Sequence, residues 1–82
     1  MKKQKLLLKI LTNPKNVHFN DMVSLVMAFG FQLDRVNGSH HIFTHPNLTE
    51  LVNLQEVNGQ AKPYQIRQFL KLVEQYQLTL EA

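Results

Sequence analysis

Two short predicted strands meet at Asn37-Gly38, and this chain reversal constrains the fold more than any other feature of the sequence. Residues 31–36 begin with apolar and polar side chains in alternation, and residues 40–45 are predicted to form a second strand, which Pro46 ends. Asparagine and glycine both tolerate the positive φ of a tight turn, so the pattern predicts a β-hairpin. An imidazole, His40, follows the turn, which therefore presents a group able to exchange protons near neutral pH.

Helical patterns flank the predicted hairpin on both sides. Asn20 is the predicted N-cap of the helix before it, and Gly30 suits the left-handed position that ends this helix. Pro63 stands at the favoured first position of the helix after it. In chain order, the sequence predicts helices over about residues 2–11 and 21–29, strands over 31–36, 40–45 and 51–54, and a helix from residue 63.

Three consecutive strands favour an antiparallel meander, one face of which needs cover from the neighbouring helices. The predicted fold class is therefore α+β in two layers, a three-stranded antiparallel sheet covered on one face by helices. This arrangement is most like a double-stranded-RNA-binding domain with an extra N-terminal helix, and it leaves the other face of the sheet open to solvent or a ligand. No repeat or linker interrupts the sequence, so residues 1–82 are predicted to form a single domain.

Composition narrows the classes of protein that fit. A chain of 82 residues buries only a small core, so a partner is expected. The absence of cysteine excludes disulfides and thiolate metal sites and favours a cytoplasmic location. No signal peptide or membrane span is predicted, because Lys9 interrupts the apolar run that begins at Leu6. The net charge of +3 suits a polyanion such as nucleic acid, and residues 1–20 contain five lysines and no acid.

The chain resembles the HicA toxin family in the motif Gly38-Ser39-His40-His41-Ile42-Phe43 and in the elements around it. The resemblance covers residues 19–80 and leaves residues 1–18 as an N-terminal helical extension. HicA proteins are small ribonucleases of bacterial type II toxin-antitoxin pairs, with a double-stranded-RNA-binding-like fold; they cleave messenger RNA and are blocked by the antitoxin HicB. The resemblance therefore implies an mRNA interferase neutralised by a HicB-type antitoxin, with His40 as its functional histidine.

Cleavage of RNA without a metal needs a group that takes the 2′-hydroxyl proton and donors that stabilise charge on the phosphate. His40 is the candidate for this general acid/base role, in which a positioned histidine supplies a factor of about 10² to 10⁴. Main-chain amides near Gly38, with the hydroxyl of Ser39, are candidates for holding a phosphate. Three basic side chains are predicted to bind phosphates without sequence preference: Lys62, Arg67 and Lys71. The second proton-transfer group stays open between His41, His45 and Tyr64, and no cofactor is predicted.

Other interpretations of the same residues stay open. A non-catalytic RNA-binding module of the same fold, or a subunit that binds only protein, also fits the composition. The histidines at 40, 41 and 45 suggest a metal site, but strand alternation places His40 on the opposite face from the other two, so no metal site is predicted. The lysines of residues 2–9 form either a solvated helix face or a surface for RNA, a membrane or the antitoxin.

Overall fold

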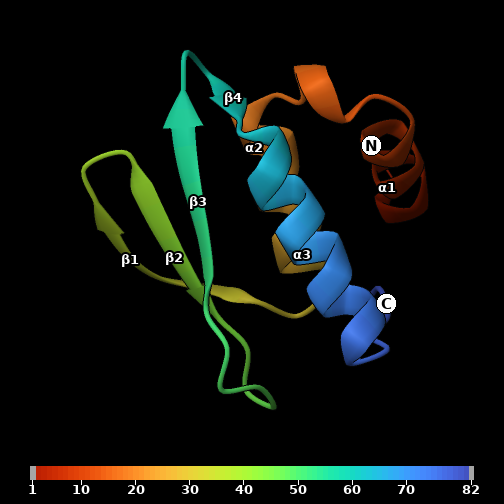
Figure 1. Ribbon diagram of the computed structural model, residues 1–82. Helices are drawn as coiled ribbons and strands as arrows, with labels where there is room; N and C mark the ends of the chain where they lie inside the picture. The colour runs from red at the N-terminus through yellow and green to blue at the C-terminus, as the bar shows by residue number, and fades with distance from the viewer. Residues whose placement is uncertain (1, 82) are drawn as a thin grey trace.

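The computed structural model describes residues 2–81 and shows an antiparallel sheet beside a group of helices (Figure 1). In chain order its elements are α1 (Lys3–Thr12), the 3-10 helix η1 (Pro14–Asn16), α2 (Phe19–Ala28), β1 (Gln32–Asn37), β2 (His40–Thr44), β3 (Val52–Val57), β4 (Gln60–Ala61) and α3 (Pro63–Gln75). The predicted class, α+β with helices over one face of an antiparallel sheet and an extra N-terminal helix, is confirmed. The sheet has a short fourth strand that the sequence pattern does not reveal, because two residues are too few to show alternation.

The strands lie in the order β1-β2-β3-β4, so that β1 and β4 are the two edges of the sheet. A register shift between Leu33 and Arg35 places a bulge in β1. The segment after η1 lies beside β4, where the Ala61 N–H donates to the Val17 carbonyl at 3.0 Å and the Phe19 N–H donates to the Gly59 carbonyl at 2.9 Å. The β4 edge is therefore covered by the chain's own backbone, whereas β1 borders solvent.

The turn of the first hairpin lies one residue later than the sequence indicates. Asn37 pairs with His40 and ends β1, so the two loop residues are Gly38 and Ser39. The φ angle is positive at Gly38 (63°) but not at Ser39, as in a type II′ turn, which takes glycine at its first loop position. The local sequence is compatible with a turn at either Asn37-Gly38 or Gly38-Ser39. The strand register that buries Phe43 selects the second position.

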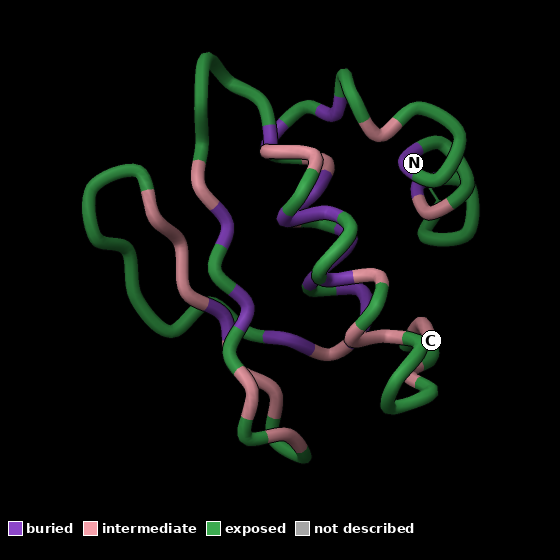
Figure 2. Tube along the Cα trace, viewed as in Figure 1, coloured by how far each residue is buried: buried purple, intermediate pink, exposed green. Residues whose placement is uncertain are grey.

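The core lies between the sheet and the helices α2 and α3 (Figure 2). Helix α2 buries Met22, Leu25 and Val26, and α3 contributes Ile66 and Phe69. Phe69 contacts the rings of Phe29 and Phe31 edge-on, with ring centroids 5.6 and 5.7 Å apart. Helix α2 begins at Phe19, earlier than the predicted cap at Asn20, and its N-cap is His18. Gly30 follows α2 with a φ of 95°, as predicted.

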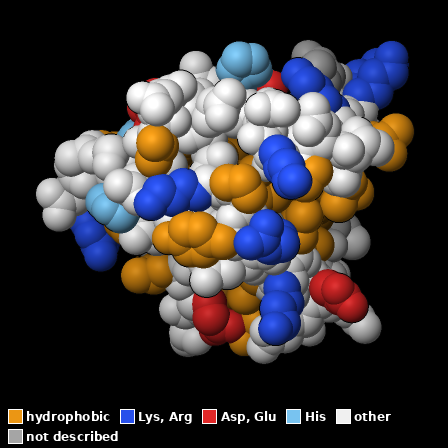
Figure 3. Space-filling view, turned by 45° about the horizontal axis from the view of Figure 1, so that its top comes forward, with side chains coloured by type: hydrophobic (Ala, Val, Ile, Leu, Met, Phe, Trp, Pro, Cys, Tyr) orange, Lys and Arg blue, Asp and Glu red, His pale blue; other side chains and the backbone are white. Residues whose placement is uncertain are grey.

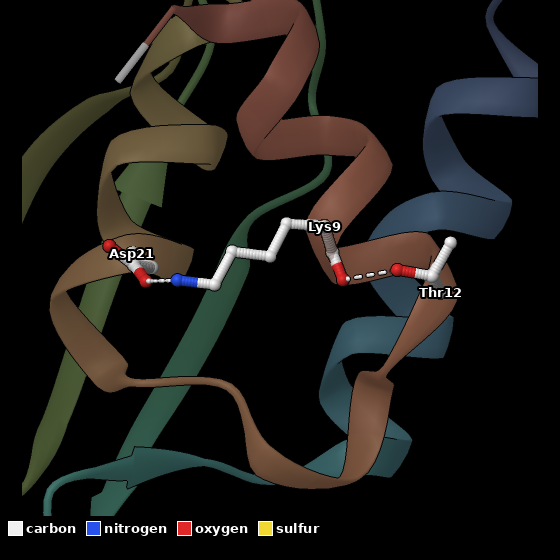
Figure 4. A network of polar contacts seen from close by, with 3 residues as sticks. All are labelled: Lys9, Thr12 and Asp21. Carbon is white, nitrogen blue, oxygen red and sulfur yellow. Dashed lines mark hydrogen bonds and ion pairs between the residues drawn. The ribbon is translucent and has the colours of Figure 1, made fainter.

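Helix α1 packs against α2 on the side away from the sheet (Figure 1). Leu6 and Ile10 are buried in the core cluster, and Lys9 forms an ion pair of 3.2 Å with Asp21 of α2 (Figure 4). At the end of α1 the Thr12 hydroxyl donates to the Lys9 carbonyl at 3.0 Å (Figure 4). Part of the lysine-rich extension thus packs on the core.

Candidate functional site

The hairpin of β1 and β2 extends beyond the helices that cover the rest of the sheet (Figures 1 and 2). All six residues of β1 are exposed. Leu33 and Val36 pair with Phe43 and His41 and so share the sheet face that is turned toward the helices. They are nevertheless 47% and 52% exposed, because no helix reaches this edge of the sheet. The hairpin is therefore a projecting element whose first strand contributes little to the core.

His40, at the start of β2, lies on the face of the sheet opposite the helices. Phe43 on the same strand is fully buried toward the helices, so alternation directs His40 and Ile42 to the other face. The His40 side chain is half-buried, and its Nδ1 lies 3.1 Å from the Oδ1 atom of Asn53 on β3. The imidazole is thus held at the surface of the sheet, not sealed in the interior.

The three residues considered for a second proton-transfer role lie elsewhere. The ring of His41 packs 4.7 Å from that of Phe19, and the ring of His45 lies 5.0 Å from that of Phe31. Both histidines are on the helix side of the sheet, as strand alternation predicts. Tyr64 is exposed on α3. None of the three lies on the sheet face that carries His40.

Two of the residues predicted to hold phosphate adjoin His40, and three belong to the helix layer. Gly38 and Ser39 form the turn directly before it. Lys62 is the N-cap of α3, and Arg67 and Lys71 are exposed one turn apart further along this helix. Figure 3 shows Lys and Arg side chains spaced across one face among apolar, neutral and acidic ones, so the basic groups of this face are dispersed and do not form a tight cluster. The structure does not bring Arg67 and Lys71 to the sheet face of His40.

The start of α3 is tied to the strand that neighbours His40. Gln55 of β3 is the cross-strand partner of His40, and its N–H donates to the Oε1 atom of the buried Gln65 at 2.8 Å. A cavity of about 160 Å³ lies between β3 and α3 beside Asn53, lined also by Gln65 and Gln68. This connection places the N-terminal end of α3 near the end of the sheet that carries His40.

A second polar contact joins the segment before β3 to the C-terminal end of α3. Hydrogen bonding with the Tyr76 hydroxyl, and then with the Thr49 hydroxyl, which donates to Glu50 Oε1 at 2.8 Å, lowers the pKa of Glu50. The same hydrogen bond raises the pKa of Tyr76. Because Glu50 precedes β3 and Gln55 lies toward its end, this contact is remote from His40 along the strand and has a structural role.

Residues 19–74 match the family described as the HicA toxin of bacterial toxin-antitoxin systems. The chain belongs to the HicA toxin family. The match includes α2, the four strands and all of α3 except its last residue, and it omits α1 and η1. No curated protein and no solved structure matches the chain. The family confirms the resemblance seen in the sequence and identifies a toxin of a toxin-antitoxin pair.

One residue beside His40 is not predicted by the sequence. Asn53 contacts the His40 ring but lies 13 positions away in a different strand, and only the pairing of Ile42 with Asn53 brings the two together. Within residues 2–81 no group of three or more His, Cys, Asp or Glu side chains is arranged to hold a metal ion. The described helices are all too short or too polar to span a membrane.

Proposed function

We propose that this HicA toxin is a metal-independent endoribonuclease that cleaves mRNA with His40 as its general acid/base. The observation that supports the proposal is the position of the imidazole. It is half-buried on the uncovered face of the sheet, and its Nδ1 is hydrogen-bonded to Asn53 of β3. A polynucleotide can approach this face without displacing a helix. His41 and His45, in contrast, are packed against core phenylalanines.

RNA supplies its own nucleophile for this reaction. The 2′-hydroxyl loses its proton to the imidazole as its oxygen attacks the adjacent phosphorus, and the bond from phosphorus to the 5′-oxygen breaks. A proton then passes to the leaving 5′-oxygen, which gives a 2′,3′-cyclic phosphate and a 5′-hydroxyl. A histidine in this role accounts for a rate factor of about 10² to 10⁴.

The remaining predicted contacts are with phosphates. The hairpin turn offers main-chain N–H groups and the Ser39 hydroxyl next to His40, and glycine at position 38 permits close approach of a phosphate. Lys62 is the N-cap of α3, at the end of this helix that Gln65 links to β3. Arg67 and Lys71 contribute to the positive field along α3. Binding through these groups is expected to weaken steeply with salt.

The proposed partner is a HicB-type antitoxin that covers the hairpin in the cytoplasm, where mRNA is the substrate. Leu33 and Val36 are apolar, exposed and close to the motif, and β1 is an open edge of the sheet. A protein that pairs with this edge and extends over His40 blocks access of RNA to it. Co-purification of the neighbouring gene product with loss of cleavage supports this role; a complex that cleaves RNA at the rate of the free toxin contradicts it.

Cleavage by the purified protein in EDTA tests the proposed activity. Wild type and His18→Ala, which alters an exposed histidine that makes no side-chain cap bond, are expected to cleave an RNA oligonucleotide. His40→Ala is expected to be slower by about 10² to 10⁴. The matching all-deoxy oligonucleotide is not cleaved, because it has no 2′-hydroxyl. Tight RNA binding by wild type without any product favours the non-catalytic module instead.

A further inference from the structure

The ring of His40 is held by a single polar side chain from the neighbouring strand. Asn53 pairs with Ile42, so it shares the outer face of the sheet with His40 and lies diagonally across from it. Its Oδ1 atom is 3.1 Å from Nδ1 of the imidazole. Among residues 2–81 the His40 ring makes no aromatic contact, unlike the rings of His41 and His45.

The chemistry of this contact decides which nitrogen carries the proton. An amide oxygen only accepts hydrogen bonds, so Nδ1 of a neutral His40 must be the donor. A neutral imidazole has one N–H, which leaves Nε2 unprotonated, with its lone pair free. The other tautomer would require the Asn53 amide to turn its NH2 group, in place of Oδ1, toward Nδ1, and would offer an N–H where a base is needed.

We propose that Asn53 is a positioning residue that fixes the Nδ1–H tautomer and the orientation of His40, so that Nε2 is the atom that exchanges protons. The catalytic part of this inference rests on the proposed ribonuclease function; the tautomer itself does not. Strand β3 is a rigid place for such a group, because Val52 and Leu54 on either side of Asn53 are buried in the core. The side chain thus projects from a fixed backbone toward the ring.

The other two histidines of the motif region show that this contact is specific to His40. His45 accepts a hydrogen bond at Nδ1 from the main-chain N–H of Asn47 at 3.1 Å, so its neutral form carries the proton on Nε2. His41 has its Nδ1 3.3 Å from the Ser39 carbonyl, a neighbour in sequence. Of these three histidines, only His40 has a ring nitrogen paired with a side chain from another strand within residues 2–81.

The tautomer is measured directly by the ¹⁵N chemical shifts of the His40 ring, without any substrate. Wild type at neutral pH is expected to show a protonated Nδ1 and an unprotonated Nε2. In Asn53→Ala the tautomers are expected to mix, whereas Asn53→Asp keeps an acceptor oxygen and is expected to retain the wild-type tautomer. A predominantly Nε2–H tautomer in wild type, or an unchanged tautomer in Asn53→Ala, overturns the proposal.

Cleavage kinetics test the catalytic part. Asn53→Ala is expected to lower kcat by about 10- to 100-fold, the loss found when the partner that orients a metal-bound imidazole is removed, with KM little changed. Asn47→Ala, an exposed asparagine in the loop after β2, is the matched control and is expected to keep the wild-type kcat. A wild-type kcat in Asn53→Ala removes the catalytic role. If wild type itself does not cleave RNA, the ribonuclease proposal fails while the ¹⁵N measurement still decides the role of Asn53.

Discussion

The two edges of the sheet, at β1 and at β4, differ in what covers them. At the β4 edge, residues 17–19 pair with the strand, and the helices cover Leu54 and Ala61 completely. At the β1 edge there is no neighbouring strand among residues 2–81, and every side chain of the strand is exposed. We call the part of the sheet near β4, over which the helices pack, the covered half, and the β1–β2 hairpin the uncovered half. The covered half stabilises the fold, and the uncovered half carries His40. Stability and the proposed activity are therefore expected to respond to different mutations.

Strand β2 belongs to both halves, so it gives the largest expected effect. Phe43→Ala removes a fully buried ring and is expected to lower the free energy of unfolding by about 3–5 kcal/mol. Thr44→Ala, at the next position and on the opposite face, is the matched control and is expected to change it by less than about 0.5 kcal/mol. Urea unfolding measures both. Equal effects of the two variants would show that β2 is not divided between a core face and a free face.

Helix α1 tests whether the covered half extends beyond the residues that match the family. Ile10 is 1% exposed, so Ile10→Ala is expected to cost about 2–5 kcal/mol of stability, toward the lower end if α2 can close over the space. Leu8→Ala, whose side chain is 62% exposed on the same helix, serves as the control and is expected to have little effect. A neutral Ile10→Ala would mean that α1 is an appendage and not part of the core.

The hairpin turn is expected to give a smaller effect on stability. Gly38 has a positive φ, and any side chain there costs about 1–2 kcal/mol although no atom lies within 4 Å of an added Cβ. Gly38→Ala is thus expected to destabilise the protein through the backbone alone. Ser39→Ala, which keeps an allowed φ, is the comparison in the same unfolding experiment. If both variants unfold like wild type, the hairpin is not folded as a type II′ turn.

The contact between Glu50 and Tyr76 is expected to have the smallest effect on stability, and this effect is expected to depend on pH. The hydrogen bonds lower the pKa of Glu50 below its ordinary value of 4.5, so their stabilising contribution is present above that pH and is lost as the pH falls through the folded-state pKa. Glu50→Gln is expected to be slightly less stable than wild type near neutral pH and to approach it in acid. Thermal unfolding at several pH values measures the difference, and a constant difference across the range would contradict this origin.

The sequence predicts the elements that are long enough to show a period. The helices α2 and α3, the strand containing Phe43 and the left-handed Gly30 follow from local patterns, and the structure confirms them. The turn position and the strand β4 do not follow, because the register depends on which side chains the helices bury and a strand of two residues has no period. Local rules fail where distant packing decides.

The same distinction holds for the candidate site. His40 is found from its place after a turn in a recognisable motif, and its location on the open face follows from alternation along β2. Asn53 cannot be found in this way, because its nearness to His40 is a property of the pairing between β2 and β3. Charge alone groups Arg67 and Lys71 with His40 in the sequence, whereas in the structure they lie in a different layer of the fold.

The most direct test measures both stability and RNA cleavage on a single variant. For His40→Ala we predict a free energy of unfolding within about 0.5 kcal/mol of wild type, because the side chain lies on the uncovered face, and a rate of RNA cleavage lower by about 10² to 10⁴. Both quantities are measured on the same preparation, by urea unfolding and by cleavage in EDTA. A variant that is equally stable and cleaves RNA at the wild-type rate would contradict the assignment of the uncovered hairpin as the functional centre.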